Sequence, residues 1–352
     1  MSLYKLLTLP LHRLRLPPPK SFDGQTVLIT GANTGLGREA ARQALELGAS
    51  TVIMGVRTLS KGEAAKQDII RKSPSTGVAI RPEAIEVWQL DMESFESVKS
   101  FASRAERYVK TGGGRLDVAI MNAGVATGKL VQTPEDGWER SLQVNCLSTT
   151  LLSLRLLPLL QHSNSKSKSS STSVLPHLVI VASDIHAIAS FPERTAPNIL
   201  HALNDREQWE KGQARNPAER YAVTKLLDHF IAIELANIAT SSSQGGATPS
   251  VIVNSLTPGF CKSDLMSPSR GEKAPLPLRV MQWLVARDVT EGAKTYVDAA
   301  VQGVSSHGKW LENQVVTDPG NIVTGQDGVR ARQQIWKEML DVLKQVDGGL
   351  MV

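Results

Sequence analysis

The chain has 352 residues, of which 41% are hydrophobic and 21% are charged, and these are the proportions of an ordinary soluble globular protein. Its formal charge of +5 comes from basic residues scattered along the chain, so the composition favours an anionic ligand and gives no sign of a nucleic-acid partner. Cys146 and Cys261 lie far apart with no metal-ligand or disulfide spacing, and no apolar run has the roughly 18 to 20 residues that span a bilayer. We therefore expect a cytoplasmic protein with free thiols and no metal site.

Residues 1–23 are expected to form an arm outside the folded body. Leucines are mixed there with basic residues such as Lys5 and Arg13, and prolines such as Pro10 interrupt the run. A signal peptide would need a longer unbroken apolar stretch and a small-residue cleavage site. The leucines of the arm are predicted to pack on the protein surface, and weak peripheral contact with a membrane is the alternative.

From residue 24 onward, short β-branched runs alternate with longer helical patterns. Strands are expected at 26–30, 51–56, 84–91, 177–183 and 250–259. Helices are expected after the first strand, up to Arg71, at about 94–110 and 135–160, and in the sequence "RNPAERYAVTKLLDHF" at 215–230. Apolar strands separated by helices indicate a parallel sheet covered on both faces. Residues 24–352 are thus predicted to form a single α/β domain, a doubly wound sheet of the Rossmann type.

Three connections are long. The Ser/Lys-rich segment 162–173 is predicted to be a solvated, flexible loop. Segment 184–217 includes a short helix around "NDREQWEKG", and the proline-containing segment 262–289 is expected to form an irregular flap. Loops of more than about 15 residues are usually functional or disordered.

The first strand and the helix after it are joined by a glycine-rich turn. Gly31, Gly35 and Gly37 stand in "TGANTGLG", where the backbone must turn tightly and let a pyrophosphate approach the helix N-terminus. Because a strand precedes the turn and a helix follows it, the pattern predicts a dinucleotide site.

Three motifs in this order resemble the short-chain dehydrogenase/reductase family over about residues 24–262. They are "TGANTGLG", "NAG" at 122–124 and "YAVTK" at 221–225. The resemblance implies an NADP(H)-dependent oxidoreductase that acts on alcohol or carbonyl groups. With "GVRTLSKGEAA" and the long segment before Tyr221, the chain looks most like retinol-dehydrogenase-type members and fungal secondary-metabolism reductases.

The family motifs also imply which residues would contact the cofactor. Asp91 matches the family's adenine ligand, although it could equally cap the helix that begins near Ser94. Met121 stands where the family often has Asn, and Ser263 where it often has Thr. The full implied set is Gly31, Asn33, Thr34, Gly35, Leu36, Gly37, Arg57, Asp91, Met92, Asn122, Ala123, Gly124, Tyr221, Lys225, Pro258, Gly259 and Ser263.

The end of the second strand indicates which nicotinamide cofactor binds. NAD sites usually carry an acidic residue there for the ribose 2′-hydroxyl, and that carboxylate would repel a 2′-phosphate. This strand ends in "MGVRTLSKG" with no acid, and Arg57 has the charge and fork geometry that suit a phosphate. NADP(H) is therefore favoured over NAD(H), and Arg38 or Lys61 could share the phosphate.

Tyr221 and Lys225 lie one helical turn apart and face the same side. Reduction of a carbonyl builds negative charge on its oxygen, which calls for a proton donor. A free tyrosine has a pKa of about 10, and a nearby positive charge is expected to move that pKa toward neutrality. The resemblance assigns Tyr221 as the acid/base and Lys225 as its tuner.

Two further residues complete the catalytic set that the resemblance implies. Ser183 ends the predicted strand 177–183 and matches the serine that binds the substrate oxygen. Asn145 matches the helix asparagine that holds a water molecule beside the lysine, and Cys146 next to it is expected in the core. His186 and His201 follow Ser183, and each could be a second acid/base or a packing residue.

The substrate pocket is expected to lie between segments 184–217 and 262–289. Apolar residues there suggest a bulky hydrophobic ligand, namely Ile185, Ile188, Phe191, Phe260, Leu265 and Trp283. The resulting hypothesis is that the protein uses NADPH to reduce a ketone or aldehyde of a hydrophobic small molecule, such as a secondary metabolite. Alcohol oxidation on the same site and a non-catalytic NADP(H)-sensing protein are the alternatives. The family also favours a homodimer through the helices at 94–110 and 135–160.

Overall fold

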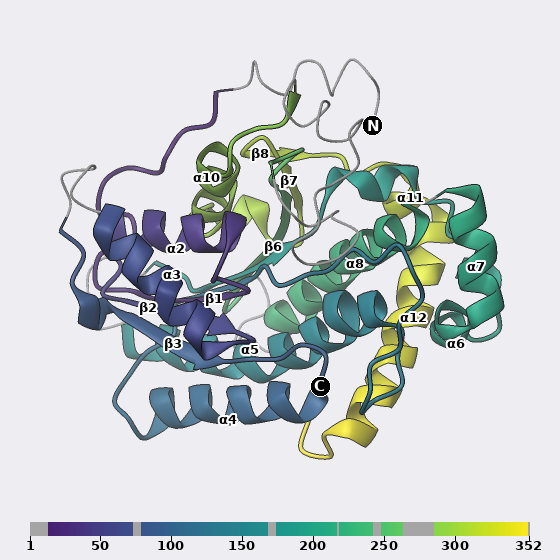
Figure 1. Cartoon of the computed structure of the whole chain (residues 1–352), viewed down its shortest axis with the longest axis horizontal. Helices are drawn as coiled ribbons and strands as arrows, with labels where there is room; N and C mark the ends of the chain where they lie inside the picture. The colour runs from purple at the N-terminus through teal and green to yellow at the C-terminus, as the bar shows by residue number, and fades with distance from the viewer. Residues whose placement is uncertain are drawn as a thin grey trace.

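The computed structural model describes residues 13–72, 79–167, 174–216, 218–241, 248–262 and 285–350, and these form a layered α/β structure (Figure 1). One sheet has the strand order β3-β2-β1-β4-β5-β6-β7-β8. Its strands are β1 (Thr26–Thr30), β2 (Thr51–Val56), β3 (Ile85–Gln89), β4 (Val118–Met121), β5 (His177–Val181), β6 (Ile252–Thr257), β7 (Trp310–Glu312) and β8 (Val315–Thr317). The predicted doubly wound fold is confirmed.

The strand order reverses between β1 and β4. All neighbouring strands from β3 to β7 are parallel, and β8 is antiparallel to β7. The parallel arrangement brings the carboxyl ends of the strands to one edge of the sheet. Ligands of open α/β sheets bind at that edge, near the reversal.

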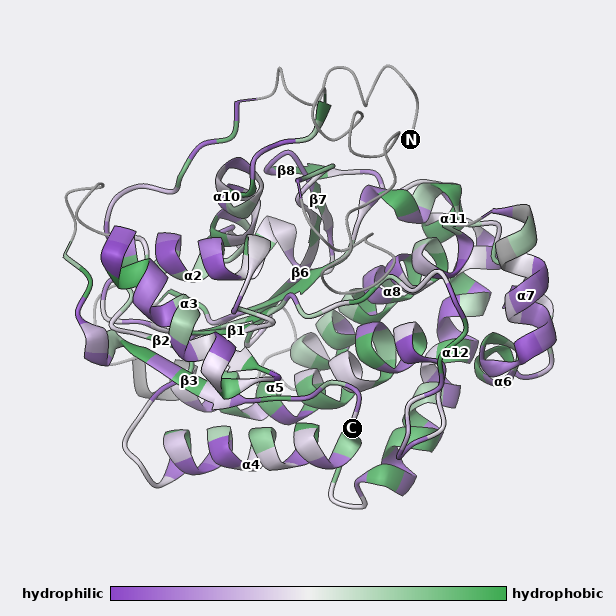
Figure 2. Ribbon diagram, viewed as in Figure 1, coloured by the Kyte–Doolittle hydropathy of each residue, from purple (hydrophilic) through white to green (hydrophobic). Residues whose placement is uncertain are grey.

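Helices cover both faces of the sheet. One face packs against α2 (Gly35–Glu46), α3 (Leu59–Lys72) and α10 (Val289–Ala299). The other packs against α4 (Phe95–Lys110), the π-helical turn η4 (Leu142–Leu147) with α5 (Ser148–Ser167), and α8 (Glu219–Ser241). In Figure 2 the central strands are mostly hydrophobic, whereas α2 and α7 carry hydrophilic stretches. The strands are buried on both faces, which explains why their sequences are continuous apolar runs.

Short elements make up the connections. These are the 3₁₀ turns η3 (Pro82–Ala84), η5 (Asp184–Ile188), η6 (Pro192–Thr195) and η8 (Val304–Ser306), and the helices α6 (Ile199–Asn204), α7 (Arg206–Arg215) and α11 (Asn321–Thr324). The short helix expected around "NDREQWEKG" is confirmed as α7.

The helix predicted over 135–160 is displaced toward the C-terminus. Residues 134–136 form a turn, and Gly137 has a φ of +71°. The carboxylate of Glu139 accepts the N–H groups of Ser141 and Leu142, so it caps the helix that starts there. The helix then runs through Ser167, so the loop predicted over 162–173 was wrong for its first six residues. Ser163 fixes this end, because its buried Oγ accepts the N–H of Leu116 before β4; residues 168–173 lie outside the described part.

The C-terminal region adds structure that the sequence patterns did not predict. Strands β7 and β8 extend the sheet, and α12 (Gln326–Val346) packs into the same core as α8. The α12 side chains Ile335, Met339 and Leu343 are fully buried. Salt bridges from Arg332 to Glu234 (2.8 Å) and from Arg155 to Asp347 (2.9 Å) join this end of the chain to α8 and α5.

The N-terminal segment is described from residue 13. Leu14 is buried, and the Arg15 N–H donates to the side chain of Gln314 at 2.8 Å. Residues 1–12 of the predicted arm lie outside the described part. None of the helices within the described ranges is long and apolar enough to cross a membrane.

We predict that α12 contributes to global stability as a core helix. Replacing the buried Ile335 with Ala should lower the free energy of unfolding by about 2–5 kcal/mol, because it removes apolar contacts and leaves a cavity. The exposed Lys337 lies on the same helix, and Lys337→Ala should change the free energy by less than about 0.5 kcal/mol. Urea unfolding measures both; equal small effects would contradict the assignment.

Candidate active site

The turn between β1 and α2 has the conformation that a dinucleotide site needs. Gly31 and Gly35 have φ values of +68° and +55°, which residues with a side chain adopt only with strain. A Cβ on Gly37 would lie 2.5 Å from Asn122 Nδ2 and 2.7 Å from the Gly31 carbonyl oxygen. All three glycines are therefore required by the backbone itself.

Asn122 connects this turn to the end of β4. Its Nδ2 donates to the Thr30 carbonyl oxygen at 2.7 Å, and its Oδ1 accepts from the Tyr296 hydroxyl at 2.9 Å. Thr30 Oγ1 accepts the backbone N–H groups of Asn122 and Ala123 at 3.0 and 2.9 Å. These bonds hold the carboxyl ends of β1 and β4 together, with α10 as a brace.

The N-terminus of α2 suits the pyrophosphate of a dinucleotide. Thr34 is its N-cap, yet the Thr34 side chain makes no capping bond, and the first turn contains no acidic residue. The first N–H groups and the helix dipole are therefore available to an anion. Asn33 and Leu36 are half-buried beside them, and nothing lies within 4 Å of the position a Cβ would take on Gly35.

The adenosine end of the predicted site carries both signs of charge. Arg57 follows β2, is 39% exposed, and forms a 2.7 Å ion pair with Glu93. Glu93 also pairs with Arg140 at 3.0 Å. Of the other two basic candidates, Arg38 pairs with Asp68 at 3.1 Å and Lys61 is exposed at the start of α3.

Asp91 and Met92 lie at the same edge, directly after β3. Asp91 Oδ1 accepts the backbone N–H of Glu93 at 3.0 Å, so the carboxylate shapes the turn that leads into α4. The capping role near Ser94 falls to Ser94 itself, whose Oγ accepts the N–H of Ser97. Met92 is buried, and its carbonyl oxygen accepts from Ser148 Oγ at 2.8 Å.

The turn after β6 is also described. Gly259 has a φ of +74°, and its N–H donates to Thr257 Oγ1 at 3.0 Å. The carbonyl oxygen of Pro258 accepts from Arg287 at 3.3 Å. Ser263, Leu265 and Trp283 lie outside the described residues, as does most of the predicted flap 262–289.

Lys225 on α8 is held by two buried acceptors. Its Nζ donates to the Val181 carbonyl oxygen at 2.9 Å and to Asp228 Oδ2 at 2.7 Å. The same Nζ lies 5.8 Å from the centre of the Tyr221 ring, one turn earlier on the helix. Val181 ends β5, so these contacts bring Tyr221 and Lys225 to the carboxyl edge of the sheet.

The expected downward shift of the Tyr221 pKa is not what the protein alone produces. Burial raises the pKa of Tyr221 above its ordinary value, the Lys225 ammonium lowers it, and the Asp228 and Asp184 carboxylates raise it again. Burial is the largest of these effects, and together with the two carboxylates it outweighs the effect of the lysine. The expectation of a pKa nearer neutrality also depends on the positive charge of an oxidised nicotinamide, so it stays a prediction for the cofactor-bound protein.

Asn145 is buried in the π-helical turn η4 and binds both neighbouring elements. Its Oδ1 accepts the Val125 N–H at 2.8 Å, and its Nδ2 donates to the Val125 carbonyl oxygen at 2.9 Å and to Thr224 Oγ1 at 3.0 Å. A Cβ on Gly124 would lie 3.3 Å from Asn145 Oδ1 and 3.6 Å from Lys225 Nζ. The absence of a side chain at Gly124 therefore leaves open the space between the asparagine and the lysine.

Ser183 lies just beyond β5, and its hydroxyl joins a polar chain. Ser183 Oγ accepts the Ile185 N–H and donates to Asp184 Oδ1, both at 3.3 Å. Thr257 Oγ1 donates to the same Asp184 oxygen at 3.4 Å. Burial raises the pKa of Asp184, and the Ser183 bond lowers it. The serine is thus linked to the turn after β6.

The two histidines named from the sequence have different surroundings. His186 is buried, with Nδ1 2.8 Å from the Ser183 carbonyl oxygen and Nε2 2.9 Å from the Pro319 carbonyl oxygen. Both ring nitrogens are occupied, so His186 has no nitrogen left to exchange a proton with a substrate. His201 is exposed beside the Trp138 ring, at 6.3 Å between centres. Of the two alternatives, a second acid/base or a packing residue, the burial of His186 and its two backbone contacts fit a packing residue.

The segment 184–217 packs against the start of α8. The N–H groups of Ser190 and Phe191 donate to Glu219 Oε1 at 2.9 and 3.0 Å. Phe191 is fully buried in the core, so it supports the segment rather than lining an open pocket. Ile185 and Phe260 are half-buried, and Ile188 is 44% exposed.

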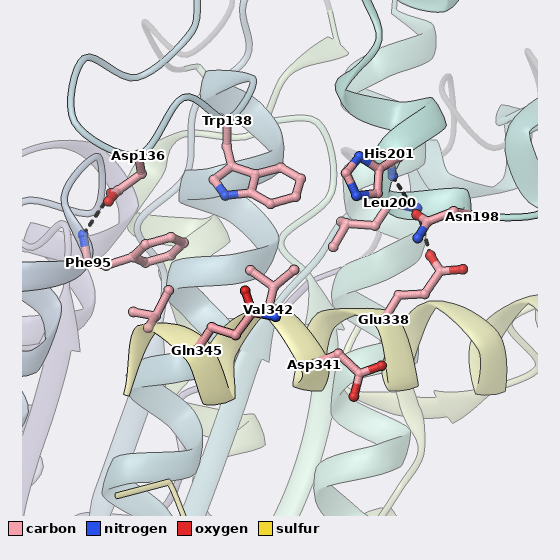
Figure 3. Close-up of a pocket in the computed structure, with 11 residues that line it drawn as sticks. Phe95, Asp136, Trp138, Asn198, Leu200, His201, Glu338, Asp341, Val342 and Gln345 are labelled. Carbon is pink, nitrogen blue, oxygen red and sulfur yellow. Dashed lines mark hydrogen bonds between the residues drawn. The ribbon is translucent and has the colours of Figure 1, made fainter. Parts of the chain in front are cut away.

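A groove of about 480 Å³ lies elsewhere, between α12, α6 and the start of α4 (Figure 3). Two of its carboxylates, Asp136 and Glu338, accept backbone N–H groups. Asp136 accepts the Phe95 N–H at 3.0 Å, and Glu338 accepts the N–H groups of Ile199 and Leu200 at 3.1 and 2.7 Å. Of the residues named from the sequence, His201 lines this groove, whereas none of the residues matched to the family's catalytic or cofactor motifs does.

Several residues of the site were not found from the sequence. Asp184 follows Ser183 directly, and Asp228 lies three residues after Lys225. Thr30 and Tyr296 bind the predicted Asn122, and Thr224 binds the predicted Asn145. Asp228 could have been found, because it lies three residues after Lys225 and so on the same helix face. Tyr296 gave no such signal, because 174 residues separate it from Asn122.

Comparison with known proteins agrees with this geometry. The family model described as short chain dehydrogenase matches residues 25–171. The short-chain dehydrogenase anuD of Penicillium roqueforti is 36% identical, and the match covers 95% of this chain and 81% of that protein. The short chain dehydrogenase/reductase dmxR8 of Cryptosporiopsis is 34% identical, with 95% and 94% covered.

Solved structures share the fold at lower identity. A short chain dehydrogenase from Salmonella enterica has a TM-score of 0.56 and 22% identity, with 86% of this chain and 100% of that chain covered. A protein of the same description from Escherichia coli, in complex with NADPH, has a TM-score of 0.55 and 21% identity, with 85% and 100% covered.

This chain belongs to the short-chain dehydrogenase/reductase family of oxidoreductases, whose members use a nicotinamide cofactor. Penicillium and Cryptosporiopsis are fungi, so the similarity to fungal members that the motifs suggested is confirmed.

We predict that Gly37→Ala impairs cofactor binding. The new Cβ would collide with Asn122 and the Gly31 carbonyl, so the turn must move. NADPH affinity should fall at least about tenfold, a loss of about 1.4 kcal/mol. Gly128→Ala is the matched control, because nothing lies within 4 Å of its Cβ position. Titration by NADPH fluorescence measures both; unchanged affinity in Gly37→Ala would contradict the assigned turn.

Proposed function

We propose that this protein is an NADPH-dependent reductase of a ketone or aldehyde carried by a hydrophobic small molecule. The observation that carries the proposal is the convergence of Tyr221, Lys225, Ser183 and Asn145 at one edge of the sheet. Lys225 binds the end of β5, and Asn145 binds Thr224 of the same helix. The four residues come from three elements that are far apart in the sequence.

The chain's own residues would handle the oxygen of the substrate. When bound, the nicotinamide supplies the hydride. Tyr221 donates its phenolic proton to the carbonyl oxygen as negative charge develops there, and Ser183 donates a second hydrogen bond. Burial raises the pKa of Tyr221, so at neutral pH the phenol is protonated, which is the form that can donate to a carbonyl oxygen.

The preference for NADPH rests on Arg57 at the end of β2. No acid directly follows this strand, and the guanidinium is 39% exposed and so within reach of a ligand. A 2′-phosphate would compete with Glu93 for Arg57, and its larger charge favours the phosphate in that competition. The NADPH complex of the Escherichia coli protein is consistent with this choice.

The hydrophobic substrate class is inferred from the entrance to the site. Ile185, Ile188 and Phe260 are incompletely buried near Ser183 and the turn after β6. The charged side chains of Lys262 and Asp288 beside that turn pair with each other at 2.8 Å. The resemblance of the sequence motifs to fungal secondary-metabolism reductases favours a secondary metabolite as the natural substrate.

We predict that Tyr221→Phe abolishes turnover while leaving the cofactor bound. Loss of the proton donor should reduce kcat by about 10²–10⁴-fold. Consumption of NADPH with a panel of hydrophobic ketones, aldehydes and quinones provides the assay, and NADPH fluorescence provides the binding control. Full turnover in Tyr221→Phe would refute the acid/base role.

We also predict opposite effects of substitution at the two ends of the Arg57–Glu93 pair. Arg57→Ala should lower kcat/KM for NADPH by about 10–100-fold and should have little effect on kcat/KM for NADH. This fold-change corresponds to the loss of one charge-assisted hydrogen bond, which contributes about 1.5–3 kcal/mol. Glu93→Gln should increase the preference for NADPH, because it removes the carboxylate that competes for Arg57. Equal losses with both cofactors would count against the phosphate contact.

A further inference from the structure

Asp228 lies on α8 three residues after Lys225 and forms a buried ion pair with it. The 2.7 Å contact joins Asp228 Oδ2 to Lys225 Nζ, and the two side chains are 3% and 6% exposed. The other oxygen, Oδ1, is buried and accepts no hydrogen bond from any residue in the described part of the chain. No element of the proposed reaction so far uses this carboxylate.

A half-satisfied carboxylate is costly in a protein interior. Burial raises the pKa of Asp228 to about 6, even though the Lys225 ammonium beside it lowers that pKa. A side chain that only packed α8 would avoid this cost. We therefore expect the Asp228 carboxylate to have an electrostatic effect on a neighbouring group that an apolar residue of similar size would not have.

That effect falls on Lys225. Burial lowers the pKa of Lys225, and the Asp228 carboxylate raises it, with a net rise above its ordinary value. The remaining acceptor of Nζ is the neutral Val181 carbonyl oxygen. The charge of the ammonium therefore depends on Asp228.

The other charged or titratable groups around Asp228 do not replace it. His229, the next residue, has its pKa lowered by burial to about 3, so it is neutral. Burial raises the pKa of the Cys146 thiol well above its ordinary value, so this group is neutral as well. Asp184 acts on Tyr221 rather than on Lys225, and Tyr221 itself must stay protonated to donate.

We propose that Asp228 is a positioning residue of the catalytic site: it is the counterion that keeps Lys225 charged and its ammonium aimed between Val181 and Tyr221. This inference rests on the proposed reductase function and extends the Tyr221–Lys225 pair to three residues. The carboxylate offsets part of the lysine charge and so helps to keep Tyr221 in its protonated, donating form.

The test compares Asp228→Asn with the wild-type protein. Asparagine has nearly the same shape and still offers an oxygen to Lys225, so it removes the charge and retains the contact. In carbonyl reduction, the alkaline limb of the kcat profile should move to lower pH. Loss of the anion lowers the pKa of Lys225, and it also removes an influence that raises the pKa of Tyr221. Asp228→Glu, which can restore the ion pair, should return the limb toward its wild-type position.

A second readout does not need turnover. Only an uncharged amine reacts with an acylating reagent, so the pH at which Lys225 becomes half-modified reports its protonation. Mass spectrometry of the Lys225 peptide should show that this pH is lower in Asp228→Asn than in the wild type. Asp298→Asn is the matched control, because Asp298 on α10 is another carboxylate whose pKa is raised by burial and it accepts a hydrogen bond from Gln302.

The outcomes separate the inference from the function on which it rests. A uniform loss of activity at every pH, with no change in the modification profile, would mean that Asp228 is only structural and would overturn the inference. A wild-type protein that reduces no carbonyl compound would overturn the proposed function, and the modification profile would still test the pairing of Asp228 with Lys225.

Discussion

The buried ammonium of Lys225 is the constraint around which the active site is arranged. A charge without water must have partners, and here they are the Val181 carbonyl oxygen and the Asp228 carboxylate. One partner is the end of a strand and the other is on the lysine's own helix, so the ion fixes α8 against β5. Tyr221 is carried on the same helix, and its position follows from this contact.

A second network sets the place of the cofactor relative to that ion. Asn122 is bonded to Thr30 on β1 and to Tyr296 on α10, and it lies so close to the glycine turn that Gly37 has no room for a side chain. Because β1 and β4 are neighbours at the reversal of strand order, the phosphate turn and the catalytic helix share one edge. The sheet therefore determines the spacing between the two parts of the site.

Buried and half-buried carboxylates fix the segments around this edge. Glu139 caps the π-helical turn that contains Asn145, Glu219 binds the backbone at Ser190 and Phe191, and Glu338 on α12 caps α6. Each replaces a missing backbone partner at the end of a helix or in a long loop. The C-terminal helix is thus joined to the segment that follows Ser183, and residues of both line the groove in Figure 3.

The fold class, the glycine turn and the four residues that we propose as catalytic could be predicted from the amino-acid sequence alone. Those features depend on local rules: apolar strand runs, positive φ at glycine, and helical spacing of Tyr221 and Lys225. Helix limits were less predictable, since the start depends on the cap by Glu139 and the extension to Ser167 is supported by the bond of Ser163 to the distant Leu116 N–H. Only the tertiary structure decided the charge balance of the site. Asp228, Asp184 and burial together raise the pKa of Tyr221, and the extent of burial depends on contacts between residues far apart in the chain.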